Sequence, residues 1–319
     1  MSNVTPHYPQ ISVIIPLYNK APYIKRAIDS VLNQTVQNFE IIIVGGRSTD
    51  GGEEIVQTYT DSRIKLVMEI GKGVSAARNQ GVNCAESEVV AFLDADDEWC
   101  VDYLETILDL KIKFPDAGMF ATGHNLIKNQ RSHIHSYMPE KKERLFSSYF
   151  QERVTSGINY HLIMTSAVSV NKHIFQKING FNTSLSYGED VDLYERLSIV
   201  TKIAYSPKVC VKYNYDIPNN TRTHVSFRNP FTFEIIDKLQ EDVKNTGDCV
   251  LNIQFNRYVK MVLISWSFQN ALRGHRKESM SLLKKAKCTK YIHIQACTII
   301  LNMLPRKILS ILMKWHYSF

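Results

Sequence analysis

Hydrophobic positions in the first part of the chain alternate between two spacings. Residues 11–17 (ISVIIPL) form a short β-branched run that is typical of a buried strand. The apolar residues after Pro22 instead recur at helical spacing, at Ile24, Ala27, Ile28, Val31 and Leu32. The same alternation repeats and predicts strands at 39–44, 64–70 and 89–93, with helices at about 50–59, 74–85 and 101–114. Single helices between strands predict an α/β fold with a parallel, buried sheet and helices on both faces.

The pattern is less regular after residue 115. It predicts strands at 117–126 and 164–170, a helix at 191–200 and a pair of strands within 203–215. From Phe231 onward the spacing is mainly helical. We therefore expect one α/β domain over residues 1–230, followed by a helical region over residues 231–319.

Charge separates the two regions further. The 319 residues carry a formal net charge of +7, yet the segment from Leu251 to Phe319 alone holds twelve Lys or Arg residues against one acid, Glu278. Its apolar runs are interrupted by Pro305, Arg306 and Lys307, so no transmembrane helix is expected. Two interpretations remain for this region: basic, apolar helices lying on an anionic membrane surface, or a helical subdomain with a solvated basic face. Nucleic-acid binding is not predicted, because aromatic residues do not alternate with the lysines.

The six cysteines show neither a CxxC pair nor a His/Cys spacing suited to zinc. The N-terminal sequence MSNVTPHYPQ lacks the basic segment and apolar core of a secretory signal. Both features predict a reduced cytoplasmic protein. Binding of the basic region to lipid would add peripheral attachment to the inner face of the cell membrane.

An acidic sequence, DADDEW at 94–99, follows the strand predicted at 89–93. Strand alternation puts Asp94 and Asp96 on one side, where two carboxylates can hold a divalent cation together with diphosphate oxygens and water. The alternative is a helix start, where acids are ordinary. We favour the cation for Asp94 and Asp96, and the helix start for Asp97 and Glu98.

A second acidic cluster, SYGEDVDLYERL at 186–197, has two interpretations that its spacing does not separate. One carboxylate can act as a general base beside a bound substrate. Alternatively, Asp190 is the N-cap of a helix in which Glu195 pairs locally.

Two further side chains are expected at the same edge of the sheet. Arg78, in GKGVSAARNQG, can reach a phosphate or the Asp94 carboxylate, or it can be a solvated helix arginine. Tyr18, which follows Pro16 in PLYNK, can stack on a nucleobase, or it can be an ordinary half-buried tyrosine at a strand end.

In their order and spacing, these segments resemble the family-2 glycosyltransferases. The matching sequences are ISVIIPLYNKAPYIKRAIDSVLNQT, FEIIIV, STDGG, GVSAARNQGV, VVAFLDADDEW and GFNTSLSYGEDVDLYERL. The resemblance implies a GT-A fold, a Rossmann-like and mostly parallel sheet flanked by helices, here with a C-terminal helical extension. It also implies an inverting hexosyltransferase that uses a nucleotide-diphosphate sugar, most simply a UDP-sugar, and Mn²⁺ or Mg²⁺. The acceptor would be a hydroxyl of a glycan or lipid-linked molecule, and the product a β-linkage.

The resemblance also assigns roles to residues. Asp190 matches the catalytic base, Asp96 the metal ligand and Glu189 a position beside the acceptor. His224 falls where relatives place a polar residue near the diphosphate. The positions matching the nucleotide-sugar pocket are Pro16, Tyr18, Arg78 and Asp94.

One loop departs from the family. Relatives usually read Val-Asp-Asp-Gly-Ser-Thr-Asp where this chain has Val44, Gly45, Gly46, Arg47, Ser48, Thr49 and Asp50. Loss of a charge-assisted hydrogen bond to the base weakens binding by roughly 1.5–3 kcal/mol, about one to two powers of ten in affinity. The alternative function is therefore a catalytically weak or inactive transferase-like protein that binds or acts as a scaffold.

Overall fold

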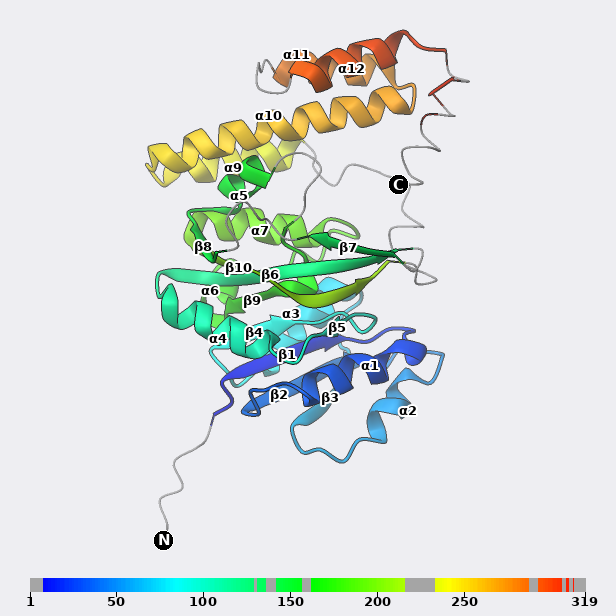
Figure 1. The fold of residues 1–319 in the computed structure, drawn as a ribbon, viewed down its shortest axis with the longest axis vertical. Coiled ribbons are helices and arrows are strands. Elements are labelled where there is room, and N and C mark those ends of the chain that lie inside the picture. Colours follow the sequence, from blue (N-terminus) through cyan, green and yellow to red (C-terminus); the bar gives the residue numbers. More distant parts are fainter. Residues whose placement is uncertain are drawn as a thin grey trace. The chain divides into compact units, whose positions relative to one another are not determined.

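The computed structural model describes residues 8–128, 131–135, 142–156, 162–215, 233–286, 292–305, 308–309 and 312 (Figure 1). The chain divides into two compact units. The first comprises Met1–Tyr149 and His161–Pro230, and the second comprises Phe150–Tyr160 and Phe231–Phe319.

The first unit is built on one large sheet with helices on both faces. Its helices are α1 (Ala21–Leu32), α2 (Gly52–Gln57), α3 (Val74–Cys84), α4 (Tyr103–Lys113), α6 (Lys172–Lys177), α7 (Glu189–Val200) and a 3-10 turn (Thr165–Ala167). Its strands are β1 (Ile11–Pro16), β2 (Phe39–Gly45), β3 (Ile64–Met68), β4 (Val89–Phe92), β5 (Glu98–Trp99), β6 (Ala117–Lys128), β7 (Arg131–His135), β8 (Arg144–Phe146), β9 (Val168–Asn171) and β10 (Lys202–Asn214).

The sheet follows the order β3-β2-β1-β4-β9-β6-β10-β5, with β7 added beside β6 and β8 beside β10. The first four strands are parallel, as the sequence predicted. Beyond β4 the sheet is mixed, because β9 runs antiparallel to both β4 and β6, whereas β6 and β10 are parallel. The reversal arises because the 3-10 turn lies beside the end of β4, so β9 starts at that edge and runs away from it. Ser166 of the turn accepts a hydrogen bond from the Asp94 amide.

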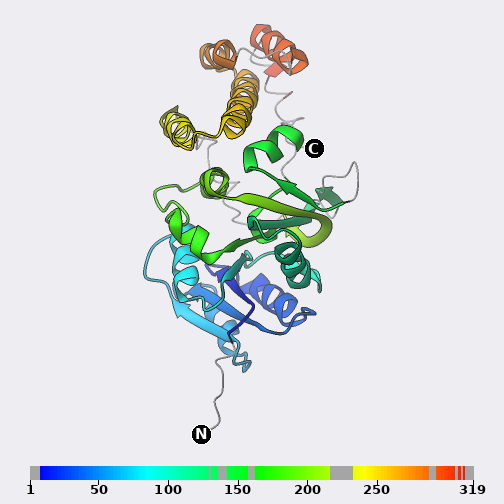
Figure 2. The same ribbon diagram turned by 90° about the vertical axis from the view of Figure 1, so that its left-hand side faces the viewer.

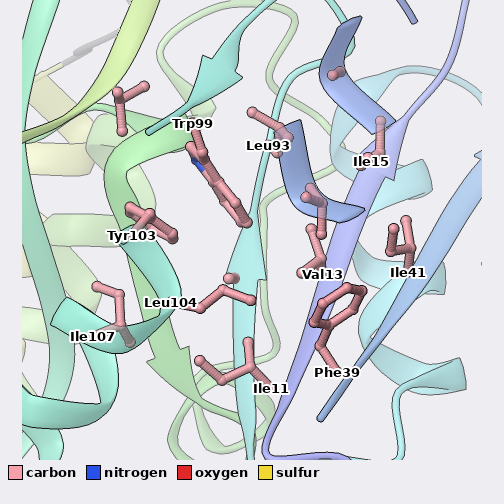
Figure 3. Packing of buried hydrophobic residues seen from close by; sticks show 14 of the residues in the cluster. Ile11, Val13, Ile15, Phe39, Ile41, Leu93, Trp99, Tyr103, Leu104 and Ile107 are labelled. Atoms are coloured by element: carbon pink, nitrogen blue, oxygen red, sulfur yellow. The ribbon is translucent and has the colours of Figure 1, made fainter. Parts of the chain in front are cut away.

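Both faces of β1 are buried, which explains its uninterrupted apolar run. On one face Ile11, Val13 and Ile15 join a cluster with apolar residues of α1 and α4 (Figure 3). On the other face α3 packs so closely that a side chain at Gly81 would collide with Ile14. The helices therefore enclose the strands from both sides, as Figure 2 shows. Polar groups are found at the ends of the strands, where the candidate site lies.

Two predicted elements differ from the structure. The strand pair within 203–215 is one long strand, β10, which bends instead of turning back. Its pairing register with β6 shifts between Ser206 and Val209, around Pro207, which has no N–H to donate to a neighbouring strand. The strand predicted at 164–170 is the 3-10 turn followed by β9.

The second unit is helical, with α9 (Phe233–Asn245), α10 (Cys249–Leu272), α11 (Arg276–Ala286), α12 (Ile292–Met303) and most of α5 (Tyr149–Ser156). The side chain of Asp248 accepts hydrogen bonds from two backbone amides and so caps α10. Phe150 of α5 packs on Phe255 and Tyr258 of α10, at ring-centroid distances of 5.1 and 5.2 Å. Within the described residues, no helix is both long and apolar enough to cross a membrane.

A buried carboxyl group in α5 makes stability depend on pH. Glu152 is fully buried and accepts a hydrogen bond from the Ser156 hydroxyl at 2.8 Å. Burial raises its pKa from 4.5 to about 7, against the opposing effects of Arg153 and Ser156. Between these two values the folded chain keeps a proton that the unfolded chain has lost, so stability falls as pH rises through this window.

We expect Glu152→Gln, which mimics the protonated acid, to be more stable than the wild type at pH 8 by up to about 3 kcal/mol. The difference should disappear below about pH 4.5, where both states of the wild type are protonated. Urea unfolding of the two proteins at several pH values measures it. A difference in stability between the two proteins that does not change with pH would contradict the raised pKa of Glu152.

Candidate active site

The carboxyl ends of β1, β2 and β4 lie at one edge of the sheet, and their loops are tied together there. Asn19, after β1, receives a hydrogen bond from the Thr49 amide and donates its own amide proton to Ser48, both in the loop after β2. Lys20 reaches across to Asp96 in the loop after β4. Residues distant in sequence thus form one polar edge, which is where parallel α/β sheets bind ligands.

Arg78 of α3 is the buried centre of this edge. Its guanidinium donates to Asp94 Oδ1 at 2.6 Å and to Glu189 Oε1 at 3.1 Å, and its side chain is only 3% exposed. It also lies over the ring of Phe181, 5.1 Å from the centroid. Burial lowers the pKa of Arg78, but Asp94, Glu189 and Asp190 together raise it. The predicted contact with Asp94 is confirmed, and the solvated-arginine interpretation is wrong.

Asp94 and Asp96 lie in the turn after β4 and not on the strand, which ends at Phe92. Strand alternation is therefore the wrong reason for placing them together. Asp96 accepts a hydrogen bond from the Lys20 ammonium at 2.6 Å. Burial and the charge of Asp94 raise the pKa of Asp96, and the Lys20 ammonium opposes that rise. The two carboxylates thus interact across the turn, each beside a basic side chain.

Asp97 is a structural residue that the sequence did not predict. It is fully buried and accepts hydrogen bonds from the Ser166 hydroxyl at 2.6 Å and the Asn214 amide at 3.1 Å. Burial, followed by the charges of Asp96 and Asp94, raises its pKa well above the usual value. Asp97 thereby fixes the acidic turn to β10 and to the 3-10 turn.

The predicted helix start at Asp97 and Glu98 is wrong. Helix α4 begins at Tyr103, and Glu98 belongs to the short strand β5, which pairs with β10. The signal for this was Trp99, which follows directly. Its ring stacks on Tyr103 and its indole N–H donates to the Ser166 carbonyl at 2.6 Å, so the segment is anchored in the interior.

Helix α7 begins at Glu189, after Gly188 in the left-handed region at a φ of 75°. Asp190 is therefore the second helical residue, and the N-cap interpretation is wrong. Glu189 is held by Arg78, and its pKa is raised by burial and by its neighbour Asp190. Asp190 is partly exposed, and one of its oxygens accepts the Val191 amide at 2.8 Å. The Glu189 carboxylate is thus occupied by Arg78, whereas the Asp190 carboxylate is partly accessible to solvent.

The part of the edge that follows β1, where the sequence resemblance implies a nucleotide pocket, is more open. Pro16 ends β1, and Tyr18, just beyond it, is 62% exposed, so the half-buried interpretation of Tyr18 is wrong. Exposed apolar side chains also lie at and just beyond the end of β3, at Met68 and Ile70. The exposed ring of Tyr18 offers a face on which a flat base can stack.

The loop that lacks the family's aspartates is held by two other acids. The Glu53 carboxylate of α2 accepts hydrogen bonds from the amides of Gly46 and Ser48 at 2.5 and 3.1 Å. Although burial opposes it, these hydrogen bonds lower the pKa of Glu53. Arg47 forms an ion pair with Glu69 at 3.2 Å and donates to the Ile70 carbonyl. The loop is thus ordered without its usual acids, and Arg47 is held against the end of β3.

Restoring an acid at Gly46 is expected to destabilise the protein. Gly46 has a φ of 115°, which side chains rarely adopt, and a Cβ there would collide with the methyl group of Met68. We expect Gly46→Asp to lower the free energy of unfolding by about 2 kcal/mol. Adding Met68→Ala should recover little of this loss, because the methyl end of the exposed Met68 side chain can move aside and the backbone strain remains. Urea unfolding of the wild type, Gly46→Asp, Met68→Ala and the double variant would show it. If Gly46→Asp is as stable as the wild type, the backbone conformation described for Gly46 is wrong.

The acidic turn offers few side-chain ligands for a divalent cation. Among the described residues, no group of three or more His, Cys, Asp or Glu side chains is arranged to hold a metal ion. Mg²⁺ and Mn²⁺ sites commonly use one or two carboxylates and take their other ligands from phosphates and water. Asp96 and Asp94 fit such a shared site, provided that Asp96 exchanges its contact with Lys20. His224 lies outside the described residues.

Comparison with known proteins identifies the family. The sequence pattern described as "Glycosyl transferase family 2" matches residues 12–178, more than half of the chain. The chain belongs to glycosyl transferase family 2. The matched range includes Arg78, Asp94 and Asp96 but ends before Glu189 and Asp190. The interpretation of these last two residues therefore rests on their geometry around Arg78.

Relatives of this glycosyltransferase occur in several bacteria. It is 31% identical over 219 residues to the uncharacterized glycosyltransferase RP339 of Rickettsia prowazekii, a match covering 67% of both chains. It is 42% identical over 122 residues to the putative teichuronic acid biosynthesis glycosyltransferase TuaG of Bacillus subtilis, covering 37% of this chain and 48% of TuaG.

The fold of the glycosyltransferase is also found in solved structures. Residues 1–349 of S. aureus TarS, crystallised with UDP-GlcNAc, superimpose with a TM-score of 0.66 at 17% identity, covering 87% of this chain and 80% of that one. The GT-A fold expected from the sequence is confirmed.

Proposed function

We propose that this glycosyltransferase moves a hexose from a UDP-sugar to a hydroxyl of a glycan or lipid-linked acceptor during cell-surface polysaccharide synthesis, with inversion to a β-linkage. The observation that carries the proposal is the double ion pair of Arg78. It joins Asp94, beyond β4, to Glu189 at the start of α7, and so brings both acidic clusters into one site. The names of TuaG and of the TarS complex with UDP-GlcNAc agree with this substrate class.

The donor would bind along the open side of the edge. Tyr18 and Pro16 provide a surface for the base, and Asp94 accepts hydrogen bonds from the ribose. Arg78 holds the Asp94 carboxylate in place through its hydrogen bond to Oδ1. The loop at Gly45 and Gly46 has no acid for the base, which supports weaker nucleotide binding than the family pattern implies.

Asp190 would act as the general base on the acceptor. As the acceptor oxygen bonds to the anomeric carbon, its proton passes to the Asp190 carboxylate and the bond from carbon to the diphosphate oxygen breaks. A single displacement of this kind inverts the anomeric centre. Glu189, held by Arg78, lies at the acceptor side of the base. A divalent cation held by Asp96 would supply positive charge that stabilises the leaving diphosphate.

Transfer from a nucleotide sugar tests the proposal directly. Purified protein with Mn²⁺ is expected to transfer or hydrolyse sugar from at least one member of a panel of UDP-, GDP- and dTDP-sugars. Calorimetry in the same buffer should show metal-dependent binding of that donor. If no nucleotide sugar binds, the enzyme proposal fails, and the alternative of an inactive transferase-like scaffold, which the Gly45-Gly46-Arg47 loop favours, takes its place.

We further propose that catalysis belongs to residues 1–230 and that the basic region 231–319 attaches a cytoplasmic protein to the membrane. Exposed apolar side chains lie on α12 at Ile299, Ile300 and Met303, and exposed lysines on α11 at Lys284 and Lys285. Apolar and basic groups together suit an anionic lipid surface.

Deleting residues 292–319 should release the protein from anionic liposomes while leaving UDP binding intact. Co-sedimentation measures the first and calorimetry the second. Liposomes of neutral lipid, which lack the electrostatic attraction, are the control. Equal sedimentation of the full-length and shortened proteins with anionic liposomes would rule out membrane attachment through this segment.

A further inference from the structure

A lysine already lies at the carboxylate proposed for the metal. The Nζ atom of Lys20 is 2.6 Å from Asp96 Oδ2, and the two side chains are only 18% and 16% exposed. Lys20 directly precedes α1, and its carbonyl accepts the amides of Tyr23 and Ile24 at 2.9 and 3.0 Å. The backbone of Lys20 is therefore fixed by the start of the helix, and its largely buried side chain extends from there to Asp96.

Asp96 is fixed from its other side as well. Its carbonyl oxygen accepts hydrogen bonds from Arg26 at 2.7 Å and from the Asn214 side chain at 3.0 Å. These contacts fix the backbone of Asp96, and the Lys20 ammonium occupies Oδ2 of its carboxylate. A cation that binds this oxygen must therefore displace the ammonium or approach it closely.

We propose that Lys20 is a resident counter-ion of Asp96 that competes with the divalent cation, so that the cation binds together with the nucleotide and not before it. This inference rests on the metal role of Asp96 in the proposed function. An ammonium beside the carboxylate repels a second cation and occupies one of its oxygens. The diphosphate of a nucleotide adds negative charge and oxygen ligands, which offset both effects. Lys20 thereby couples the binding of metal and donor.

Substitution of Lys20 separates this role from that of an ordinary surface ion pair. Lys25, also in the α1 region, provides a matched control because its Nζ lies 2.6 Å from Asp29 Oδ2, but its side chain is 69% exposed. Mn²⁺ binding to wild type, Lys20→Met, Lys20→Gln and Lys25→Met would be measured by electron paramagnetic resonance, with and without UDP. Thermal unfolding would verify that each variant is folded.

Without UDP, both Lys20 variants are expected to bind Mn²⁺ at least tenfold more tightly than the wild type, and Lys25→Met should match the wild type. The enhancement of Mn²⁺ binding by UDP should shrink by the same factor in the Lys20 variants, since the coupling is reciprocal. The use of two uncharged replacements keeps the test valid if one fails to fold. A gain in Lys20→Met alone, with Lys20→Gln folded, would indicate a steric effect and overturn the inference.

Failure of the inference and of the proposed function can be told apart. If the wild type binds Mn²⁺ with UDP but the Lys20 variants gain nothing in its absence, the competition is wrong and the metal site stands. If no protein binds Mn²⁺ even with UDP, the metal role of Asp96 fails, and the role of Lys20 fails with it.

Discussion

Replacing Asp190 with Asn is expected to reduce kcat by about 10³-fold, within the range usual for loss of a general base. The amide keeps the size of the side chain and an oxygen for the Val191 amide, so the start of α7 should be preserved. It cannot accept the acceptor proton, however. Because Asp190 does not hold the donor in the proposed arrangement, the affinity for UDP should stay within about twofold, a difference of less than 0.5 kcal/mol.

Turnover measured with saturating donor, together with calorimetry of UDP binding, checks this expectation. Asp192→Asn is the control on the same helix, since Asp192 forms an ion pair with Arg196. It should keep most of the turnover. If Asp190→Asn retains more than a tenth of the wild-type kcat, Asp190 is not the base, and Glu189 becomes the next candidate.

Replacing Arg78 with Met is expected to affect both stability and donor binding. The Asp94 and Glu189 carboxylates would lose their shared counter-ion inside the site. Breaking a buried pair by removing one partner typically costs about 3–5 kcal/mol. Asp94 is 29% exposed, so solvent screening favours the lower end, about 3 kcal/mol.

Urea unfolding measures the stability of the Arg78 variants, and calorimetry at a temperature where they remain folded measures UDP affinity. Arg78→Lys is the informative comparison. A single ammonium lacks the planar fork that serves two carboxylates, so this variant should lie between Met and the wild type in both measurements. Wild-type UDP affinity in Arg78→Met would contradict the role of Arg78 in the donor site.

Much of the first unit was predictable because its signals are local. Each strand from β1 to β4 has its own apolar run, and each following helix its own helical spacing, so their type could be assigned segment by segment. Parallel pairing then follows from the connections, and it places the residues after β1, β2 and β4 at one edge. This reasoning correctly brought Arg78 and Asp94 together.

The failures have a different cause, since they concern residues whose partners lie far along the chain. Asp97 was taken for a helix start because its neighbours are acids, yet its partners are Ser166 and Asn214, 69 and 117 residues away. The ion pair of Lys20 with Asp96 spans 76 residues. The bend in β10 also depends on its pairing with β6. None of these partners leaves a periodic signal in the sequence.

The backbone conformation of Gly46 constrains how this loop can evolve. An aspartate codon is one base change from a glycine codon, but the resulting side chain would stand at a φ of 115°, which residues other than glycine rarely adopt. The Met68 methyl can move aside, because that side chain is 63% exposed, so a smaller residue at 68 would not make the acid acceptable. Compensation must come from residues that set the backbone of the loop. Variants that regain the acid should therefore be sought in libraries that randomise residues 45–48 together.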